Sequence, residues 1–179
     1  MNNFGDPYTK LARSAVESHV KSGSHIQIPQ NLPEEFYSRR AGVFVTIFRG
    51  KELRGCIGTY HPSKGNLAEE LVANAIAAAI HDYRFVAITS EELPFLRYEV
   101  SVLGEPKKIS DPHGMDPKKN GVIVQCGDGR CGLLLPDIEG VTTFEQQVFI
   151  ACQKGEINLF EDKPQLFSFT VEKHAESEE

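Results

Sequence analysis

The hydrophobic positions of the chain change several times from the spacing of a helix to that of a strand. Residues 7–22 repeat apolar side chains at helical spacing, behind a capping carboxylate at Asp6 and a proline at the first helical position. Residues 42–48 and 53–60 are rich in β-branched and aromatic side chains, and the RGKE between them is typical of a turn. These segments predict a first helix followed by an antiparallel hairpin.

The segment after this hairpin predicts a buried helix. Residues 66–82 are apolar on every side beyond the first turn, which indicates a helix without a wet face. Asn74 is the only polar residue between Glu70 and His81. Its amide must therefore find hydrogen-bond partners inside the protein.

The second half of the chain predicts four more strands, a loop and a helix. Residues 95–104 alternate apolar and polar side chains, as does a last strand at 166–173. Residues 121–136 predict a hairpin around Gly-Asp-Gly, and 142–156 predict an amphipathic helix. Residues 105–120 contain three prolines and several charges and predict a long surface loop.

Hairpins dominate this order of elements, and no βαβ series occurs, so the fold class predicted is α+β. A mainly antiparallel sheet packed with helices satisfies the pattern. The length of 179 residues suits one domain or one domain with a small appendage. We expect a single domain over 1–179, with a core over about 7–173 and an acidic tail at 174–179.

Composition narrows the classes of function. Twenty-five acidic against 19 basic residues give a net charge of −6, and the basic residues form only short pairs, which disfavours nucleic-acid binding. No stretch approaches the roughly 20 apolar residues of a membrane helix. The segment MNNFGDPYTK lacks the apolar region of a secretory signal. We therefore expect a cytoplasmic protein without membrane contact.

Four cysteines occur without a CxxC pair, and in a reducing compartment they should be thiols. Cys126 and Cys131 flank GDGR and lie where a hairpin would bring them opposite one another, so whether they pair stays open. The histidines lack metal-ligand spacing. We predict neither a metal site nor a cofactor.

The stretch LRGCIG at 53–58 holds the main candidate site. In a strand, Arg54, Cys56 and Gly58 share one face, and neighbours on that face lie about 7 Å apart. A guanidinium beside a thiol lowers the pKa of the thiol, and a glycine leaves room for a ligand. The hypothesis is a pocket lined by Arg54 and Cys56. The alternative is an inert core thiol, with glycines that let a helix pack closely.

Other polar residues have a structural and a functional interpretation. Asn74 pins a strand or loop, or it contacts the pocket of Arg54 and Cys56. Glu99 lies on the polar face of its strand, which is either solvated or part of that pocket. His81 complements a helix dipole, while Asp82 and Arg84 anchor a loop by ion pairing. A Cys–His–Asp arrangement with the thiol is the functional alternative.

Four stretches together resemble one family: LRGCIGTY, AIAAAIHDYRF, YEVSVLGEP and GLLLP. The chain is similar to the AMMECR-type domain family, whose prokaryotic members are called AmmeMemoRadiSam system protein A. The resemblance implies an α+β fold with a smaller second subdomain. It also implies a link to a Memo-type protein and a radical-SAM protein. It does not imply a particular activity, because none is established for the family. The C-terminal third lacks the tryptophan-containing insertion of many relatives.

These observations favour a small-ligand-binding or partner-docking domain that acts with the Memo-type and radical-SAM proteins. The alternative is an enzyme that uses Cys56 with Arg54 on a small anionic metabolite. An RNA-associated regulator is disfavoured by charge. The sequence contains no complete acid–base or nucleophile–base set, so it leaves open whether the protein is an enzyme.

Overall fold

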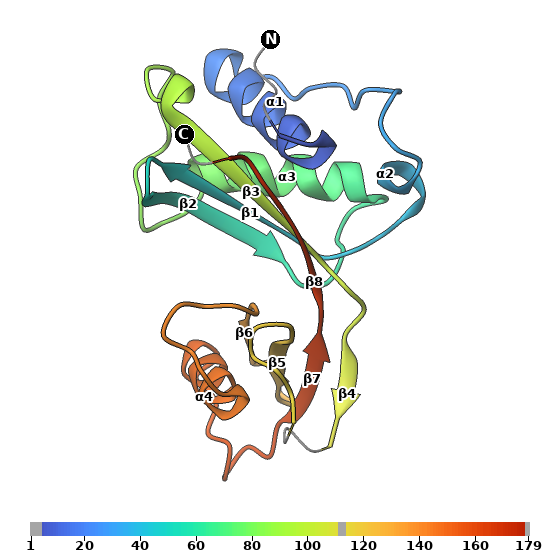
Figure 1. Cartoon of the computed structure of the whole chain (residues 1–179), viewed down its shortest axis with the longest axis vertical. Coiled ribbons are helices and arrows are strands. Elements are labelled where there is room, and N and C mark those ends of the chain that lie inside the picture. Colours follow the sequence, from blue (N-terminus) through green and yellow to red (C-terminus); the bar gives the residue numbers. More distant parts are fainter. Residues whose placement is uncertain (1–4, 111–113, 178–179) are drawn as a thin grey trace. The chain divides into compact units, whose positions relative to one another are not determined.

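The computed structural model describes residues 5–110 and 114–177. Three stretches lie outside this part: residues 1–4 of the segment searched for a signal, residues 111–113 of the predicted loop, and residues 178–179 of the predicted tail. The chain forms two compact units: unit 1 holds residues 1–102 and 172–179, and unit 2 holds residues 103–171. The predicted α+β class, with a smaller second part, is confirmed (Figure 1).

Unit 1 is a four-stranded sheet with helices on one face (Figure 1). The sheet order is β2-β1-β3-β8, and β1 pairs antiparallel with both β2 and β3. The strands are β1 (Val43–Arg49), β2 (Glu52–Thr59), β3 (Leu96–Leu103) and β8 (Val171–Ala175). The helices are α1 (Pro7–Ser22), α2 (Glu35–Ser38), α3 (Leu67–Ile80) and the 3₁₀ turn η1 (Leu93–Phe95).

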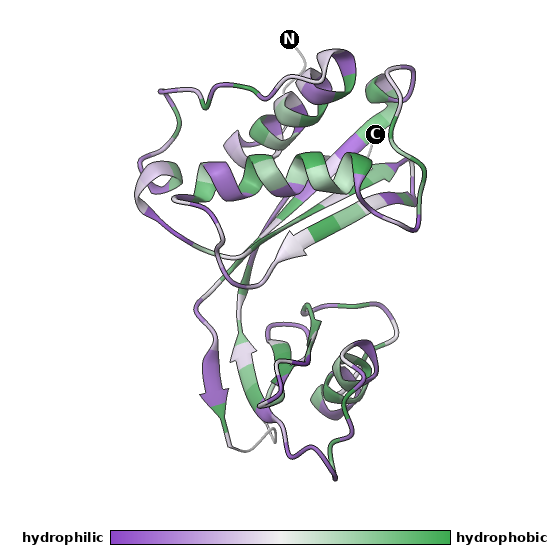
Figure 2. Cartoon of the chain, turned by 180° about the vertical axis from the view of Figure 1, so that it is seen from behind, coloured by the Kyte–Doolittle hydropathy of each residue, from purple (hydrophilic) through white to green (hydrophobic). Residues whose placement is uncertain are grey.

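The core of unit 1 follows the predicted alternation. Val43, Val45 and Ile47 of β1 are fully buried, as are Tyr98 and Val100 of β3. Figure 2 shows α3 as hydrophobic over most of its length, whereas hydrophilic and hydrophobic positions mix along α1. The predicted burial of α3 is therefore confirmed. No described helix has both the length and the apolar character needed to span a bilayer.

Unit 2 is a second sheet with one helix against it. Its order is β4-β7-β5-β6, with antiparallel pairing throughout. The elements are β4 (Lys107–Ile109), β5 (Gly121–Gln125), β6 (Cys131–Leu134), α4 (Phe144–Lys154) and β7 (Gln165–Phe169). Val122, Val124, Phe144, Val148 and Ala151 lie in its separate core.

The last strand predicted at 166–173 is in fact two strands in different sheets. Thr170 is exposed and separates β7 from β8. Alternation shows that residues lie in strands, but it does not show which sheet they join. The tail expected from residue 174 also differs, because β8 continues to Ala175 and Glu176 is buried.

Candidate functional site

The LRGCIG stretch lies in β2, at the edge of the unit 1 sheet. An edge strand presents backbone groups that need partners. At Cys56 these partners are side chains: the amide donates to Asp82 Oδ2 at 2.8 Å, and the carbonyl accepts from Arg84 Nη2 at 3.3 Å. Asp82 and Arg84 therefore take the place of a neighbouring strand.

The carboxylate of Asp82 is held in its charged form. Hydrogen bonds from the Arg84 side chain lower its pKa to about 2, against the opposing effect of burial. The backbone amides of Cys56 and Arg84 add to the lowering. Because only 3% of the Asp82 side chain is exposed, the ion pair with Arg84 at 2.7 Å is partly shielded from water.

Arg54 contacts the loop that follows α3. Its Nε and Nη2 donate to the two carboxylate oxygens of Glu92 at 2.7 and 3.0 Å. Its Nη1 donates to the carbonyl of Val86 at 2.9 Å, and Nη2 also reaches the carbonyl of Ala87 at 3.4 Å. Such bidentate pairing fixes both side chains in one geometry. Arg54 thus braces this loop.

Glu92 is a site residue that the sequence analysis missed. Its pKa is lowered by the hydrogen bonds from Arg54, and its Oε2 also accepts from the Thr89 amide at 3.0 Å. A carboxylate shortly before Pro94 is typical of a helix start. That local signal could have identified Glu92 as a helix N-cap, but it could not have predicted the ion pair with Arg54.

We call residues 81–95 the edge loop. It is anchored through Asp82, through Glu92, and through Ile88, whose side chain is buried and whose amide donates to the Ala79 carbonyl at 2.9 Å. Between these anchors the loop exposes large apolar side chains. The exposed fractions are 94% for Tyr83 and 82% for Val86, and Phe95 is also exposed.

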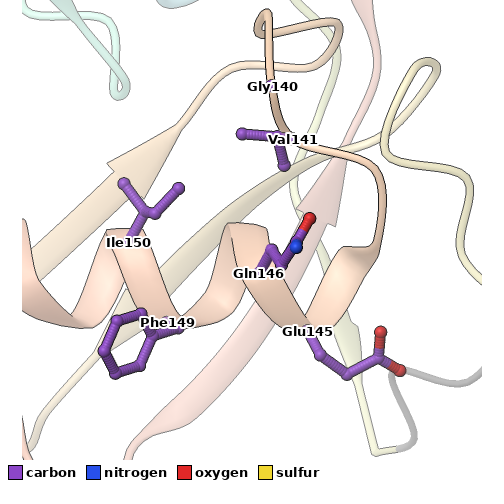
Figure 3. A pocket seen from close by; sticks show the side chains of 6 residues that line it. All are labelled: Gly140, Val141, Glu145, Gln146, Phe149 and Ile150. Atoms are coloured by element: carbon purple, nitrogen blue, oxygen red, sulfur yellow. The ribbon is translucent and has the colours of Figure 1, made fainter.

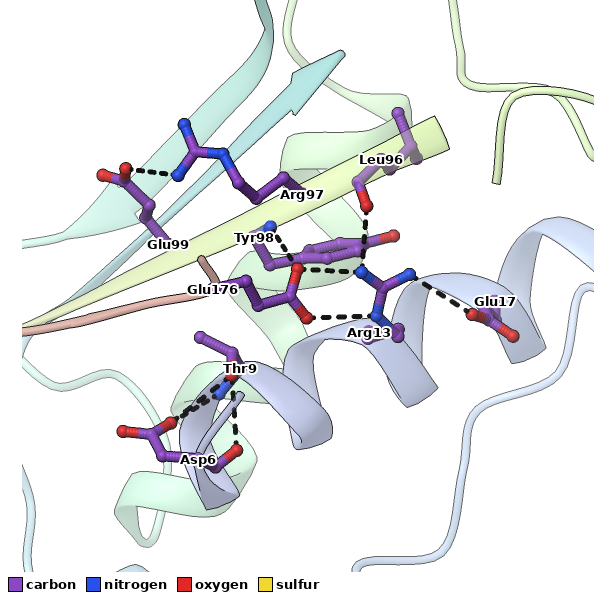
Figure 4. A network of polar contacts seen from close by, with 9 residues as sticks. All are labelled: Asp6, Thr9, Arg13, Glu17, Leu96, Arg97, Tyr98, Glu99 and Glu176. Atoms are coloured by element: carbon purple, nitrogen blue, oxygen red, sulfur yellow. Dashed lines mark hydrogen bonds and ion pairs between the residues drawn. The ribbon is translucent and has the colours of Figure 1, made fainter. Parts of the chain in front are cut away.

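The Cys56 thiol lies in a row of polar side chains that crosses three strands. Cys56 is opposite Thr46, and Thr46 is opposite Glu99. The thiol sulfur is 3.3 Å from Thr46 Oγ1. Glu99 pairs with Arg97 at 2.8 Å (Figure 4) and with Lys173 at 3.1 Å. The structure therefore places Cys56 and Glu99 on one face of the sheet.

Burial alone would raise the pKa of Glu99, but the hydrogen bonds from Arg97 and Lys173 outweigh it and lower the pKa. The carboxylate is charged at neutral pH and already has two cationic partners. Glu99 is therefore not a protonated general acid, and its negative charge is already paired. Lys173 could not be assigned from sequence, because β8 is far from β3 along the chain.

The two glycines of LRGCIG have different neighbours. A Cβ atom on Gly55 would lie 2.2 Å from the Ala78 carbonyl oxygen of α3, so this glycine permits close helix packing. A Cβ on Gly58 would lie 2.3 Å from the ring of Phe44. The ligand space expected above Gly58 is therefore occupied by Phe44.

Asn74 lies on the opposite side of the sheet from Cys56. Its Nδ2 donates to the Val43 carbonyl at 3.0 Å and to Thr59 Oγ1 at 3.1 Å. Thr59 in turn donates to the buried carboxylate of Glu70 at 2.5 Å. The structure thus assigns Asn74 the structural role, in which it ties β1 and β2 to α3.

His81 does not complete a Cys–His–Asp arrangement. It is exposed at the C-cap of α3, where its amide donates to the Ala77 carbonyl. The Asp82 carboxylate contacts the backbone of Cys56 and the Arg84 side chain. Asp82 and Arg84 therefore anchor a loop, which is the structural alternative.

All four cysteines are free thiols, Cys126 and Cys131 included. Cys131 is opposite Gln125 in the β5–β6 hairpin, while the Cys126 amide donates to the Arg130 carbonyl. Within residues 5–110 and 114–177, no three His, Cys, Asp or Glu side chains come together as a metal site.

Comparison with known proteins supports the family resemblance. The AMMECR1 family model matches residues 9–174. The chain belongs to the AMMECR1 family. A Thermotoga maritima protein is 47% identical to this AMMECR1-family chain over 169 residues, which cover 94% of the chain and 97% of the relative.

Two further relatives are a longer protein and a protein with a crystal structure. Protein CA_C1420 of Clostridium acetobutylicum is 43% identical over 173 residues, but the match spans only 36% of its length. The crystal structure of the uncharacterised protein PH0010 from Pyrococcus horikoshii has a TM-score of 0.84 and 34% identity. That similarity covers 93% of this chain and 88% of PH0010. The AMMECR1 fold is thereby confirmed.

Proposed function

We propose that this AMMECR1-family protein is a partner-docking domain, and that the edge loop is its contact surface. The observation that carries the proposal is the bidentate Arg54–Glu92 pair beneath exposed Tyr83 and Val86. Large apolar side chains on a protein surface cost free energy unless something covers them. A loop that holds them in one geometry loses less conformational entropy when a partner binds.

The contacts of Arg54 disfavour the binding of a small anionic ligand at this side chain. Its guanidinium donates to the Glu92 carboxylate and to the carbonyls of Val86 and Ala87. Binding an anion there would require breaking a charge-assisted pair at a side chain that is 13% exposed. Docking a protein on the outer surface of the loop requires no such loss.

An enzyme that uses Cys56 is the second candidate. A nucleophilic thiol needs a base or a cation that stabilises the thiolate. The polar contact that the structure gives the thiol is the Thr46 hydroxyl, which supplies neither. The charged side chains of Asp82 and Arg84 contact the backbone of Cys56.

The partners we propose are the Memo-type protein and the radical-SAM protein that the family resemblance implies. The test is calorimetric titration of the purified chain against each purified partner from the same genome. We expect the double variant Tyr83→Ser, Val86→Ser to bind one of them at least tenfold more weakly than the wild type. Exposed aromatic anchors are common sources of such losses.

Two matched variants serve as controls. Phe160→Ser removes an equally exposed aromatic side chain from unit 2, and Cys56→Ser removes the thiol. Both should bind like the wild type. Wild-type binding by the Tyr83, Val86 variant, or a tenfold loss with Cys56→Ser at unchanged stability, would contradict docking at the edge loop.

A further inference from the structure

Unit 2 contains a second surface that the proposed function does not use. A pocket of about 410 Å³ lies between α4 and the turn before it (Figure 3). Its lining residues come from that turn and from the first two turns of the helix: Gly140, Val141, Glu145, Gln146, Phe149 and Ile150. We call this pocket the α4 groove.

Val141 and Ile150 of the groove lining pack against the unit 2 core, whereas Phe149 lies outside that cluster. Phe144, Val148 and Ala151 form the inward face of α4 and are buried. Phe149 is 59% exposed, Ile150 is half-buried, and Ile138 in the preceding turn is 40% exposed. Phe149 therefore gives α4 one exposed apolar side chain beyond the face that its own sheet covers.

The other wall of the groove is held in place by hydrogen bonds. Thr143 caps α4 in a reciprocal capping box with Gln146. Gln146 Oε1 accepts from the amides of Thr142 and Thr143 at 2.8 and 3.2 Å. Gly140 has a φ of 80°, which favours glycine, and the Val141 amide donates to the Ile138 carbonyl. The groove is thus formed before any ligand arrives.

The segment that forms the groove carries acidic charges only. Residues 136–150 contain Asp137, Glu139 and Glu145, and no lysine, arginine or histidine. Asp137 and Glu139 are exposed in the turn, and Glu145 lines the groove. An apolar slot with an acidic border attracts a partner whose apolar side chains are flanked by cations.

We infer that the α4 groove binds a protein segment that inserts one or two large apolar side chains and carries lysine or arginine on either side of them. Grooves beside a helix recognise short segments through such apolar anchors. The flanking cations would approach Asp137 and Glu139 and raise the rate of association. This surface belongs to unit 2, so it is independent of docking at the edge loop.

Three synthetic peptides test the inference by fluorescence anisotropy with the full chain. One carries Leu-Phe flanked by lysines, one carries Leu-Phe flanked by glutamates, and one has the lysines with Leu-Phe replaced by Ser-Ser. We expect only the first to bind below millimolar concentration. Phe149→Ser should weaken this binding at least tenfold, and Glu139→Gln should weaken it two- to threefold and lessen its salt dependence.

Phe160→Ser is the matched control in unit 2, because it removes an exposed phenylalanine outside the groove lining. It should bind the lysine peptide like the wild type, as should the Tyr83→Ser, Val86→Ser variant. The inference is overturned if no peptide binds, if the serine or glutamate peptide binds equally well, or if Phe160→Ser loses as much as Phe149→Ser. A change of the free protein's oligomeric state in Phe149→Ser, seen by sedimentation, would assign the groove to a second copy of the chain instead.

Discussion

The amide and carbonyl of Cys56 meet the side chains of Asp82 and Arg84 at the outer edge of β2. Sequence reasoning singled out these three residues, but it weighed the thiol and the imidazole of His81 as the reacting groups. In the structure the backbone of Cys56 is the group that is bound. The LRGCIG stretch therefore has a clear structural role at its edge, in which it anchors the loop after α3.

Asp82→Asn tests that role at the residue scale. The wild-type carboxyl has a pKa of about 2 in the folded chain, against an ordinary 3.8. A lowered folded pKa gives stability that is present above pH 4 and is lost as pH falls from about 4 to about 2. The asparagine variant should be about 2 kcal/mol less stable at pH 7, and the difference should shrink towards pH 2. Urea unfolding measured across this range checks it, and a pH-independent difference would contradict it.

Gly55→Ala tests the contact between β2 and α3. The added methyl group would meet the backbone carbonyl of Ala78, which cannot move without shifting the helix. We expect a loss of about 2–3 kcal/mol in the free energy of unfolding. Gly127→Ala is the control, since a Cβ there meets nothing within 4 Å and should change stability by less than about 0.5 kcal/mol. Equal effects of the two changes would remove the packing explanation.

Strand periodicity predicted at the residue scale which side chains of one strand share a face, but not that Thr46 lies between Cys56 and Glu99 on neighbouring strands. It could not predict which partner each charge finds. Arg54 pairs with Glu92, 38 residues away, because the edge loop folds back onto β2. Asn74 is separated from Cys56 because α3 covers the Gly55 face of the sheet, a choice that alternation alone does not encode.

At the scale of elements, the edge loop has its own internal anchors. Glu92 accepts from Arg54 and from the Thr89 amide, while buried Ile88 joins the unit 1 core. These contacts explain how a segment without regular secondary structure over most of its length can hold Tyr83 and Val86 outward. The stability of the loop should therefore depend on Glu92 near one end, as it does on Asp82 near the other.

Glu92→Gln should loosen the edge loop more than it destabilises the sheet. Hydrogen bonds to a charged group contribute about 1.5–3 kcal/mol each, so we expect the Thr89 amide to exchange at least tenfold faster with solvent. Native-state hydrogen exchange measures this directly. Glu52→Gln, which removes an exposed carboxylate from β2, should leave the exchange rate nearly unchanged. Equal rates in both variants would show that Glu92 is not the brace.

Helices and strands with long regular patterns were predictable from the sequence, as α1, α3 and β3 demonstrate. The edge loop and the split between β7 and β8 were not. Both depend on contacts between segments far apart in the chain, and a local pattern of apolar residues has no information on those contacts. The same limit hid the α4 groove, because the pattern over 142–156 identified only the inward face of the helix.

For the whole molecule, the notable feature is that unit 1 is built from both ends of the chain. Arg13 of α1 forms a bidentate pair with Glu176, whose carboxylate also accepts from the Tyr98 amide of β3 (Figure 4). Arg13 further donates to the Leu96 carbonyl. The last described residues thus close unit 1, although their acidic composition predicted a solvated tail.

Glu176→Ala should destabilise unit 1 selectively. Removing one partner of a largely buried ion pair costs about 3 kcal/mol, because the other charge and the Tyr98 amide lose their acceptor. All five tyrosines lie in unit 1, and the chain has no tryptophan, so tyrosine fluorescence reports on this unit alone. We expect its unfolding midpoint to fall, with Glu34→Ala, which removes an exposed carboxylate from unit 1, as the control for lost charge. An unchanged midpoint would show that the terminal segment does not contribute to unit 1.

Docking through the edge loop is tested most directly by hydrogen–deuterium exchange of the full chain, free and bound to the Memo-type or radical-SAM protein. Docking there predicts that protection on binding is greatest around Tyr83 and Val86 and absent in the Phe160 segment of unit 2. Protection confined to the strand that carries Cys56, with the exchange of residues 81–95 unchanged in the complex, would contradict it.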